Sequence, residues 1–392
     1  MNTTEQGIVL LLKSAITGEA YHLPEDFRLE EAYPVIQKQG IEPLCYIAAV
    51  TCGIPKSSPV MVSMFQKYCQ HLRDSESQLM EIRRIYNAFE SHGIDFMPVK
   101  GCNMKLLYPA PELRTMGDAD ILIKLEQYPQ IERVMQSLGF RFEVESDHEL
   151  VWKSDRLFLE LHKKLIPSNS KDYYAYYGDG WKLAKRCEGH HYYMTDEDMF
   201  LYIFTHYAKH YRIGGVGCRQ LLDLWVCLRA YPSLDLDYIR REAAKLQLEE
   251  FFDNTMRTID VWFNGAATDG KVEAITKFLF SDGIWGTEMN LALAKGVAYK
   301  ETSDSKVPGW LRNYLEAIFQ TPTDMKRRYP IFGRYPVLLP FSWPYYWVTT
   351  LLFRQENVRR RIRLSAAMEE EDRLDAYEKS LEYVGLRFNF RQ

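Results

Sequence analysis

The sequence predicts an α+β fold in which a small mixed β-sheet lies between helical N- and C-terminal regions. Two observations predict it. Apolar residues recur at helical spacing before residue 92 and again after about residue 195. Between these limits, short segments rich in branched residues are separated by Gly and Pro. We therefore expect a helical region over residues 1–91, a sheet-containing core over residues 92–194 and a helical region over residues 195–392.

The N-terminal region is expected to be helical throughout. Apolar residues have helical spacing in IVLLLKSAI, in YPVIQKQGIEPLCYIAAV and in the long run MVSMFQKYCQHLRDSESQLMEIRRIYNAFES. The long helix should end at His92-Gly93, because glycine readily adopts the left-handed conformation that closes a helix.

The middle region alternates strands and helices. IDFMPVKG is expected to be a strand, NMKLLY a short helix, ADILIKL a second strand and QYPQIERVMQSLG an amphipathic helix. The segments FRFEVE, ELVWKS and RLFLELHKKL then alternate between apolar and polar residues with period two. This order predicts a mixed sheet with helices on one side.

The C-terminal region returns to helices. Thr195 followed by three acidic residues predicts the start of a helix that runs through MFLYIFTHYAKHY. Residues 214–217 then form a glycine-rich turn before CRQLLDLWVCLRAY, and no Lys-Ser/Thr follows to make this turn a phosphate site. The aromatic segment 335–353 is long enough to span a membrane, but three prolines interrupt it. Four arginines follow at 359–363, which would suit anionic headgroups, yet we favour packing on the protein over membrane contact through residues 335–363.

Charge and cysteine usage restrict the partners and the compartment. The net charge of −4 and the pI near 6.2 give no basic surface for phosphate neutralisation, so no duplex nucleic acid is expected as a partner. The seven cysteines form no C-x-x-C pair, and the N-terminus has no basic region before its apolar run. We expect reduced thiols, no signal peptide and a cytoplasmic location.

Asp118, Asp120 and Glu160 are the candidate catalytic and metal-binding residues. Residues two apart in a strand point to the same face, so Asp118 and Asp120 should project together, as should Glu160 and His162. If the two strands are neighbours, three carboxylates meet, and their mutual repulsion is relieved by a cation. Such oxygen ligands suit Mg²⁺ or Mn²⁺. A D-x-D pair alone is common on surfaces, so the surrounding order of residues must carry the assignment.

The order of residues around these carboxylates resembles the pattern of a known family. The segment MPVKGCNMKLLYPAPELRTMGDADILI, continued by FLELHKKL, looks like the uncharacterised branch of the polymerase-beta-like nucleotidyltransferases. The resemblance is sharp over residues 92–166 and looser over HYAKHYRIGGVGCRQLLDL. It implies a minimal nucleotidyltransferase sheet, an NTP such as ATP as substrate, and in-line attack on its α-phosphate. It also implies that Asp118 and Asp120 bind both metals, and that Glu160 binds the catalytic metal and helps to activate the acceptor hydroxyl.

One departure from the family pattern affects the phosphate site. Gly101 would let the backbone approach the triphosphate. The usual Gly-Ser or Gly-Gly pair is Gly101-Cys102 here, so a phosphate-contacting hydroxyl is missing, and Lys100 could replace it as a point charge.

Further candidates for nucleotide or acceptor binding lie outside the acidic triad. They are Lys100, Gly101, Arg114, His162, His206, His210, Arg219 and Asp223. His206 and His210 share one helix face, but no acidic residue completes an H-E-x-x-H motif, so the polar lining of a cleft is favoured over metal ligation. Arg219 and Asp223 have the same spacing and could pair with each other. We expect these helices to form a wall of the cleft.

Two functions remain open at this point. The leading one is metal-dependent transfer of a nucleoside monophosphate from an NTP to a hydroxyl of a small molecule or protein, which the acidic triad favours. The alternative is a non-catalytic nucleotide- or partner-binding protein that retains the fold, which the Gly101-Cys102 departure favours.

Overall fold

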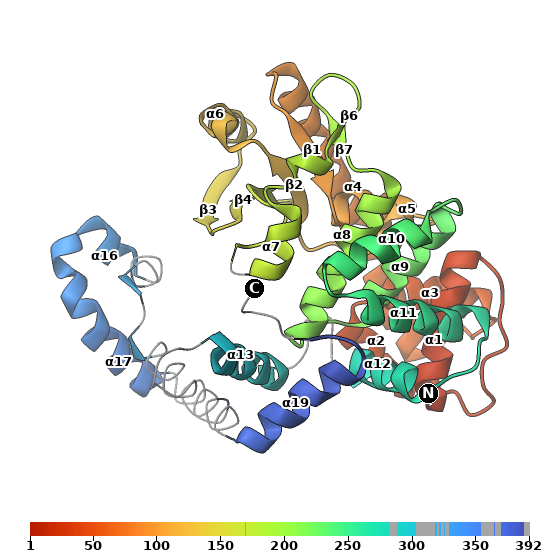
Figure 1. Ribbon diagram of the computed structural model, residues 1–392. Coiled ribbons are helices and arrows are strands. Elements are labelled where there is room, and N and C mark those ends of the chain that lie inside the picture. The colour runs from red at the N-terminus through yellow and green to blue at the C-terminus, as the bar shows by residue number, and fades with distance from the viewer. Residues whose placement is uncertain are drawn as a thin grey trace.

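A five-stranded mixed sheet with helices around it forms the middle of the chain (Figure 1). The computed structural model describes residues 1–168, 170–281, 288–302, 318–319, 321–322, 325, 329–353, 364 and 370–387. The strands of the sheet are β1 (Phe96–Val99), β2 (Ala119–Ile123), β3 (Arg141–Glu145), β4 (Glu149–Lys153) and β5 (Phe158–His162). Their order is β1-β2-β5-β4-β3, and only β2 and β5 run parallel. The predicted α+β fold with a mixed sheet is confirmed.

One face of this sheet is apolar. Ile121 of β2, Leu161 of β5 and Trp152 of β4 are fully buried there. They pack in one cluster with residues of α4 (Pro59–Ser91) and α6 (Tyr128–Ser137). The period-two alternation of the strands places their polar residues on the opposite face.

Helices from both ends of the chain build a second core on the other side of the sheet. It includes residues of α1 (Thr3–Thr17), α3 (Glu42–Thr51), α8 (Asp196–Arg212), α9 (Cys218–Ala230) and α11 (Glu249–Ile259). The other α-helices in the described part of the chain are α2 (Leu29–Gln39), α5 (Gly101–Leu107), α7 (Lys171–Tyr177), α10 (Leu236–Lys245), α12 (Gly270–Ser281), α13 (Glu288–Thr302), α16 (Pro330–Arg334), α17 (Ser342–Phe353) and α19 (Glu371–Tyr383). Two short strands, β6 (Lys185–Arg186) and β7 (Tyr192–Tyr193), pair with each other.

Helix ends follow the sequence signals closely. Thr195 caps α8, because its hydroxyl accepts a hydrogen bond from the Asp198 amide at 3.2 Å. The long helix α4 ends at Ser91, and Gly93 then adopts the left-handed φ of +68°. Both predicted boundaries are confirmed.

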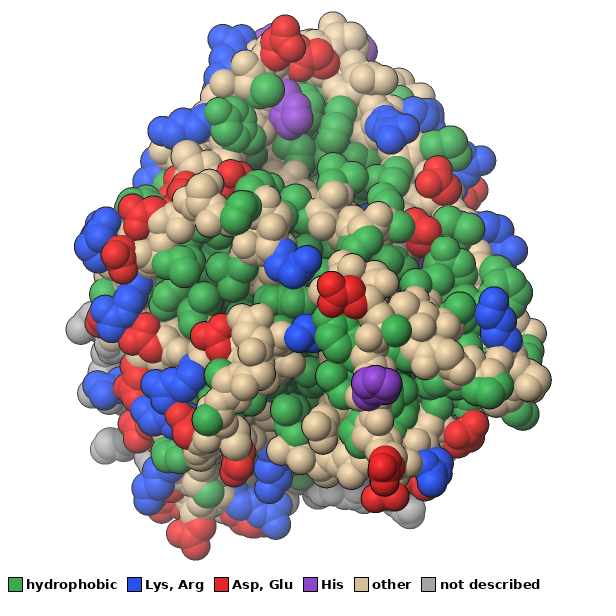
Figure 2. Space-filling model, turned by 90° about the vertical axis from the view of Figure 1, so that its right-hand side faces the viewer, with side chains coloured by type: hydrophobic (Ala, Val, Ile, Leu, Met, Phe, Trp, Pro, Cys, Tyr) green, Lys and Arg blue, Asp and Glu red, His purple; other side chains and the backbone are tan. Residues whose placement is uncertain are grey.

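The aromatic segment near the C-terminus forms short helices broken at prolines. Residues 336–341 make a 3₁₀ helix, and α17 follows directly. Among the described residues, no helix has the length and apolar character needed to cross a membrane. The arginines at 359–363 lie outside the described residues. On the face of the molecule in Figure 2, acidic and basic side chains are interspersed.

Candidate active site

The polar face of the sheet brings the predicted carboxylates together. Asp120 of β2 lies directly opposite Glu160 of the parallel strand β5, which confirms the predicted adjacency of these strands. Asp118 is partly exposed and immediately precedes β2 instead of lying within it. His162 shares the face of Glu160 and is fully buried.

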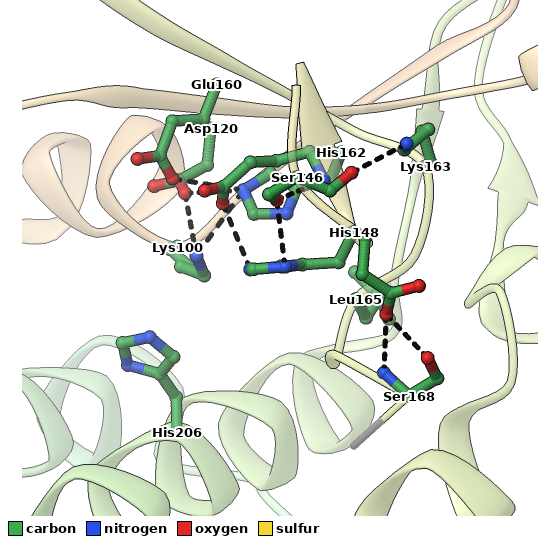
Figure 3. Close-up of polar contacts among 12 residues, drawn as sticks. Lys100, Asp120, Ser146, His148, Glu160, His162, Lys163, Leu165, Ser168 and His206 are labelled. Atoms are coloured by element: carbon green, nitrogen blue, oxygen red, sulfur yellow. Dashed lines mark hydrogen bonds and ion pairs between the residues drawn. The ribbon is translucent and has the colours of Figure 1, made fainter. Parts of the chain in front are cut away.

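Asp120 is the centre of the hydrogen bonds in this cluster (Figure 3). Lys100 donates from Nζ to Asp120 Oδ1 at 2.7 Å, and His162 Nε2 lies 2.8 Å from the same oxygen. His162 Nε2 is also 3.5 Å from Glu160 Oε2. The buried aspartate is therefore held by two nitrogen groups on neighbouring strand ends.

The two aspartates differ in their protonation. Burial, together with the negative charges of Asp120 and Glu160, raises the pKa of Asp118 to about 7. Burial alone would also raise the pKa of Asp120, but the Lys100 ammonium and the His162 hydrogen bond outweigh burial and hold it below its ordinary value. A divalent cation beside Asp118 would remove the repulsion that raises its pKa.

A cavity of about 290 Å³ opens over these residues. Its walls come from the ends of β1, β2 and β5, from the loop before β2, and from α8 and α9. Ten of the eleven predicted site residues line it: Lys100, Gly101, Arg114, Asp118, Asp120, Glu160, His206, His210, Arg219 and Asp223. The eleventh, His162, is buried behind Asp120. Segments more than 100 residues apart in the sequence thus share one cavity.

Comparison with known proteins agrees with this arrangement. The model of a family described as uncharacterised nucleotidyltransferase matches residues 25–264, which include every predicted site residue. The chain belongs to this nucleotidyltransferase family. The match extends well beyond residues 92–166 on both sides, so the helices that flank the sheet are part of what defines the family. Neither the curated proteins nor the solved structures include a match.

The turn at the end of β1 differs from the expected glycine turn of a nucleotidyltransferase. Lys100 itself has the positive φ of +44°, whereas Gly101 begins α5 with an ordinary φ. A Cβ at Gly101 would lie 3.2 Å from Met116 Sδ and 3.3 Å from Arg114 Nη1. A side chain here would therefore push these two side chains of the loop before β2 aside by a few tenths of an ångström, and the strained residue is Lys100.

Arg114 and Asp223 form a buried ion pair in the wall of this nucleotidyltransferase cavity. Arg114 donates from Nε and Nη2 to the two Asp223 oxygens at 2.8 and 2.9 Å, and Tyr108 donates to Oδ1 at 2.8 Å. Arg219 instead donates to the carbonyl and hydroxyl of Thr115 at 3.0 and 2.7 Å. The predicted pairing of Arg219 with Asp223 is wrong, because the bidentate Arg114 bond takes the carboxylate.

The histidine pair of α8 faces the cavity as a neutral unit. The Nε2 atoms of His206 and His210 are 3.1 Å apart, so one ring donates and the other accepts. Burial and the neighbouring His210 lower the pKa of His206. Burial followed by Lys209 and Lys100 lowers the pKa of His210 to about 3. Figure 3 shows His206 extending from α8 toward the Lys100–Asp120 pair.

Three further cavity residues were missed by sequence reasoning: His148, Glu149 and Lys209. The Lys209 ammonium makes no hydrogen bond or ion pair with any described residue, and burial together with Lys100 lowers its pKa to about 8. Its position next to His210 was the available signal. Glu149 begins β4 opposite His162 in the sheet register, and His148 immediately precedes it.

Two groups of side chains within the described residues have the spacing of metal ligands. One contains Asp120, Glu160 and His162, and the other contains His148, Glu149 and His162. In each group, one ligand atom from every residue lies within 4.8 Å of the others. The first group holds two of the three predicted ligands, with His162 in place of Asp118.

Proposed function

We propose that this protein transfers a nucleoside monophosphate from an NTP to a hydroxyl group of a small molecule or a protein. The observation that carries the proposal is the pairing of Asp120 with Glu160 across parallel strands, beside Asp118, at the floor of the cavity. Membership of the nucleotidyltransferase family supports the reaction class. The acceptor's identity would depend on the groups of α8 and α9 that form the opposite wall.

The donor set fits a hard divalent cation. Asp118, Asp120 and Glu160 offer carboxylate oxygens, the ligands that Mg²⁺ and Mn²⁺ prefer. The raised pKa of Asp118 is the behaviour expected of a carboxylate that is buried beside like charges, whose repulsion a cation would relieve. When bound, such an ion supplies positive charge to the attacking and leaving oxygens of the displacement.

The side chains of the protein would orient the reaction. The acceptor oxygen forms a bond to the α-phosphorus while the bond from this phosphorus to the pyrophosphate oxygen breaks, and pyrophosphate leaves. Glu160 receives the hydroxyl proton. Lys209 holds the polyphosphate, since its ammonium faces the cavity without a partner among the described residues. Lys100 is already bound to Asp120, so its main role is to orient that carboxylate and not to bind phosphate.

The non-catalytic alternative is less well supported. It was favoured by Cys102, which replaces a small or hydroxyl residue of the family pattern. Cys102 is buried in the apolar cluster beneath the sheet, and its thiol contacts Tyr86. Burial raises the pKa of this thiol to about 12, so it is neutral. A residue that points away from the cavity leaves the backbone of this turn free to approach a phosphate.

Nucleotide consumption by matched variants tests the proposal. The four NTPs, labelled at the α-phosphate, are incubated with Mg²⁺ or Mn²⁺ and hydroxyl acceptors, including the protein itself. Pyrophosphate release and the mass of the product are measured. Asp118→Asn should lower the rate by roughly a hundredfold or more, because the metal contributes several kcal/mol to the barrier. Asp155→Asn is the control, since this aspartate is exposed and Arg141 is its one ion-pair partner among the described residues.

The outcomes separate the two functions. Label transfer by the wild type and by Asp155→Asn, lost in Asp118→Asn, supports the enzyme. Nucleotide binding by the wild type without turnover on any acceptor favours the non-catalytic alternative. Absence of nucleotide binding under every metal condition contradicts the enzyme and favours the non-catalytic alternative in its partner-binding form.

A further inference from the structure

A second group of metal-type ligands lies beside the carboxylate triad. His148, Glu149 and His162 each offer one ligand atom, and these atoms lie within 4.8 Å of one another. Glu149 pairs directly with His162 across β4 and β5, and His148 precedes Glu149. The imidazole rings of His148 and His162 have centroids 5.8 Å apart, and Figure 3 shows them one above the other. None of the expected roles of the acidic triad uses His148 or Glu149.

The hydrogen bonds of His162 leave one ring nitrogen available as a ligand. Its Nε2 lies 2.8 Å from the Asp120 carboxylate, which can only accept while ionised, so Nε2 carries the proton. Nδ1 is buried and has no hydrogen-bond partner among the residues that the structure describes. The opposite tautomer would bury an unsatisfied N–H group, which is unfavourable. A carboxylate that orients a histidine in this way is the usual arrangement behind a metal-ligating imidazole.

A hydrogen bond also orients the ring of His148. Its Nδ1 lies 3.3 Å from the Ser146 hydroxyl, which can accept a hydrogen bond from Nδ1–H in the tautomer that leaves Nε2 unprotonated. That Nε2 lies 3.0 Å from Glu149 Oε2. In that tautomer the nitrogen and the carboxylate oxygen both present lone pairs, so a cation between them would relieve their repulsion.

We propose that His148, Glu149 and His162 bind a transition-metal ion of the zinc class, at a site distinct from the Asp118–Asp120–Glu160 carboxylates. Two imidazoles and one carboxylate form a ligand set that zinc accepts while keeping a fourth position open. His148 and Glu149 line the cavity, so the open position faces it and would take an oxygen of a bound acceptor. The nitrogen ligands separate this site chemically from one that prefers Mg²⁺.

Binding of Co²⁺ in excess Mg²⁺ tests the site without any nucleotide reaction. Co²⁺ accepts zinc ligand sets and absorbs visible light when tetrahedral, and Mg²⁺ occupies the oxygen-only triad. The full-length wild type should bind about one equivalent of Co²⁺, which Zn²⁺ displaces. His148→Gln and Glu149→Gln should each lose the absorption band. Ser146→Ala should bind roughly tenfold to hundredfold more weakly, because it removes the group that orients His148.

Two controls make the result decisive. His22→Gln removes an exposed histidine far from the cluster in sequence and should bind Co²⁺ like the wild type. Thermal unfolding in a chelator shows whether each variant is folded, and Glu149→Gln serves if His148→Gln is not. Asp118→Asn should keep the absorption band. Equal Co²⁺ binding by the wild type and the His148 and Glu149 variants overturns the site. Displacement by Mg²⁺, or loss of the band in Asp118→Asn, would show that Co²⁺ occupies the carboxylate triad instead and also overturns it.

Discussion

The Arg114–Asp223 ion pair should be a major determinant of stability. It joins the loop before β2 to α9 through two hydrogen bonds of 2.8 and 2.9 Å, and the side chains are only 10% and 5% exposed. Asp223→Leu would leave the buried guanidinium without its carboxylate, at a cost of about 3–5 kcal/mol. It would also remove the acceptor of the Tyr108 hydroxyl, for about 1 kcal/mol more. Asp223→Asn keeps an acceptor for both donors and should cost roughly half as much.

Urea unfolding of a double-mutant cycle measures this contribution. Arg114→Leu and Asp223→Leu should each be strongly destabilising, while the double variant should be no less stable than the worse single one, because neither charge is then left unpaired. Arg240 and Asp253 provide the matched control. They form a pair of similar geometry, with hydrogen bonds of 2.9 and 2.8 Å, but their side chains are 47% and 40% exposed. Asp253→Leu should cost less than about 1 kcal/mol. Additive losses at Arg114 and Asp223, or equal losses at the buried and exposed pairs, would refute the reasoning.

The remaining predictions concern metal, nucleotide and nucleic acid. Calorimetry should show that Asp120→Asn loses most of the affinity for Mg²⁺ or Mn²⁺, and equal binding by the wild type would contradict its role as a ligand. Lys209→Met should raise the KM for NTP with kcat nearly unchanged, because a group that binds the polyphosphate in both ground and transition states affects binding alone. The protonated form of Lys209 binds the anion and exists below its pKa of about 8, so NTP affinity should fall about tenfold for each pH unit above that value. Lys209→Arg stays charged and should abolish this pH dependence. A generic DNA duplex should not be retarded at physiological salt, and a salt-dependent shift would contradict the expectation drawn from the net charge of −4.

The strands and the buried face of the sheet could be predicted because both depend on the pattern of residues that are close together in the sequence. Alternation with period two determines which residues share a face, and the apolar residues determine which face is buried. These rules were sufficient to predict that Glu160 lies beside Asp120, which the strand register confirms. The same rules placed Asp118 inside the strand, whereas the ladder begins at Ala119. Strand ends are less determined, since the last residues have few ladder bonds to hold them.

The pairing of charged residues could not be predicted from spacing. A helical i, i+4 pair such as Arg219 and Asp223 contributes only about 0.2–0.5 kcal/mol on a surface. A buried bidentate bond to Arg114 satisfies both carboxylate oxygens of Asp223, and leaving that charge unpaired would cost several kcal/mol. Arg114 is 109 residues away in sequence, so this partner becomes visible only when the fold is known.

The charge balance of the cavity also emerges only in three dimensions, and it suggests an order of binding. Four cations and five carboxylates line it: Lys100, Arg114, Lys209, Arg219, Asp118, Asp120, Glu149, Glu160 and Asp223. The charges cancel within the Lys100–Asp120 pair and within the Arg114–Asp223 pair. The other charged side chains of the cavity include more carboxylates than cations, and this excess would repel a free polyphosphate. A bound divalent cation would change the net charge of the cavity from negative to positive. The nucleotide should therefore bind together with its metal or after it, and Lys209 then meets a phosphate instead of a carboxylate.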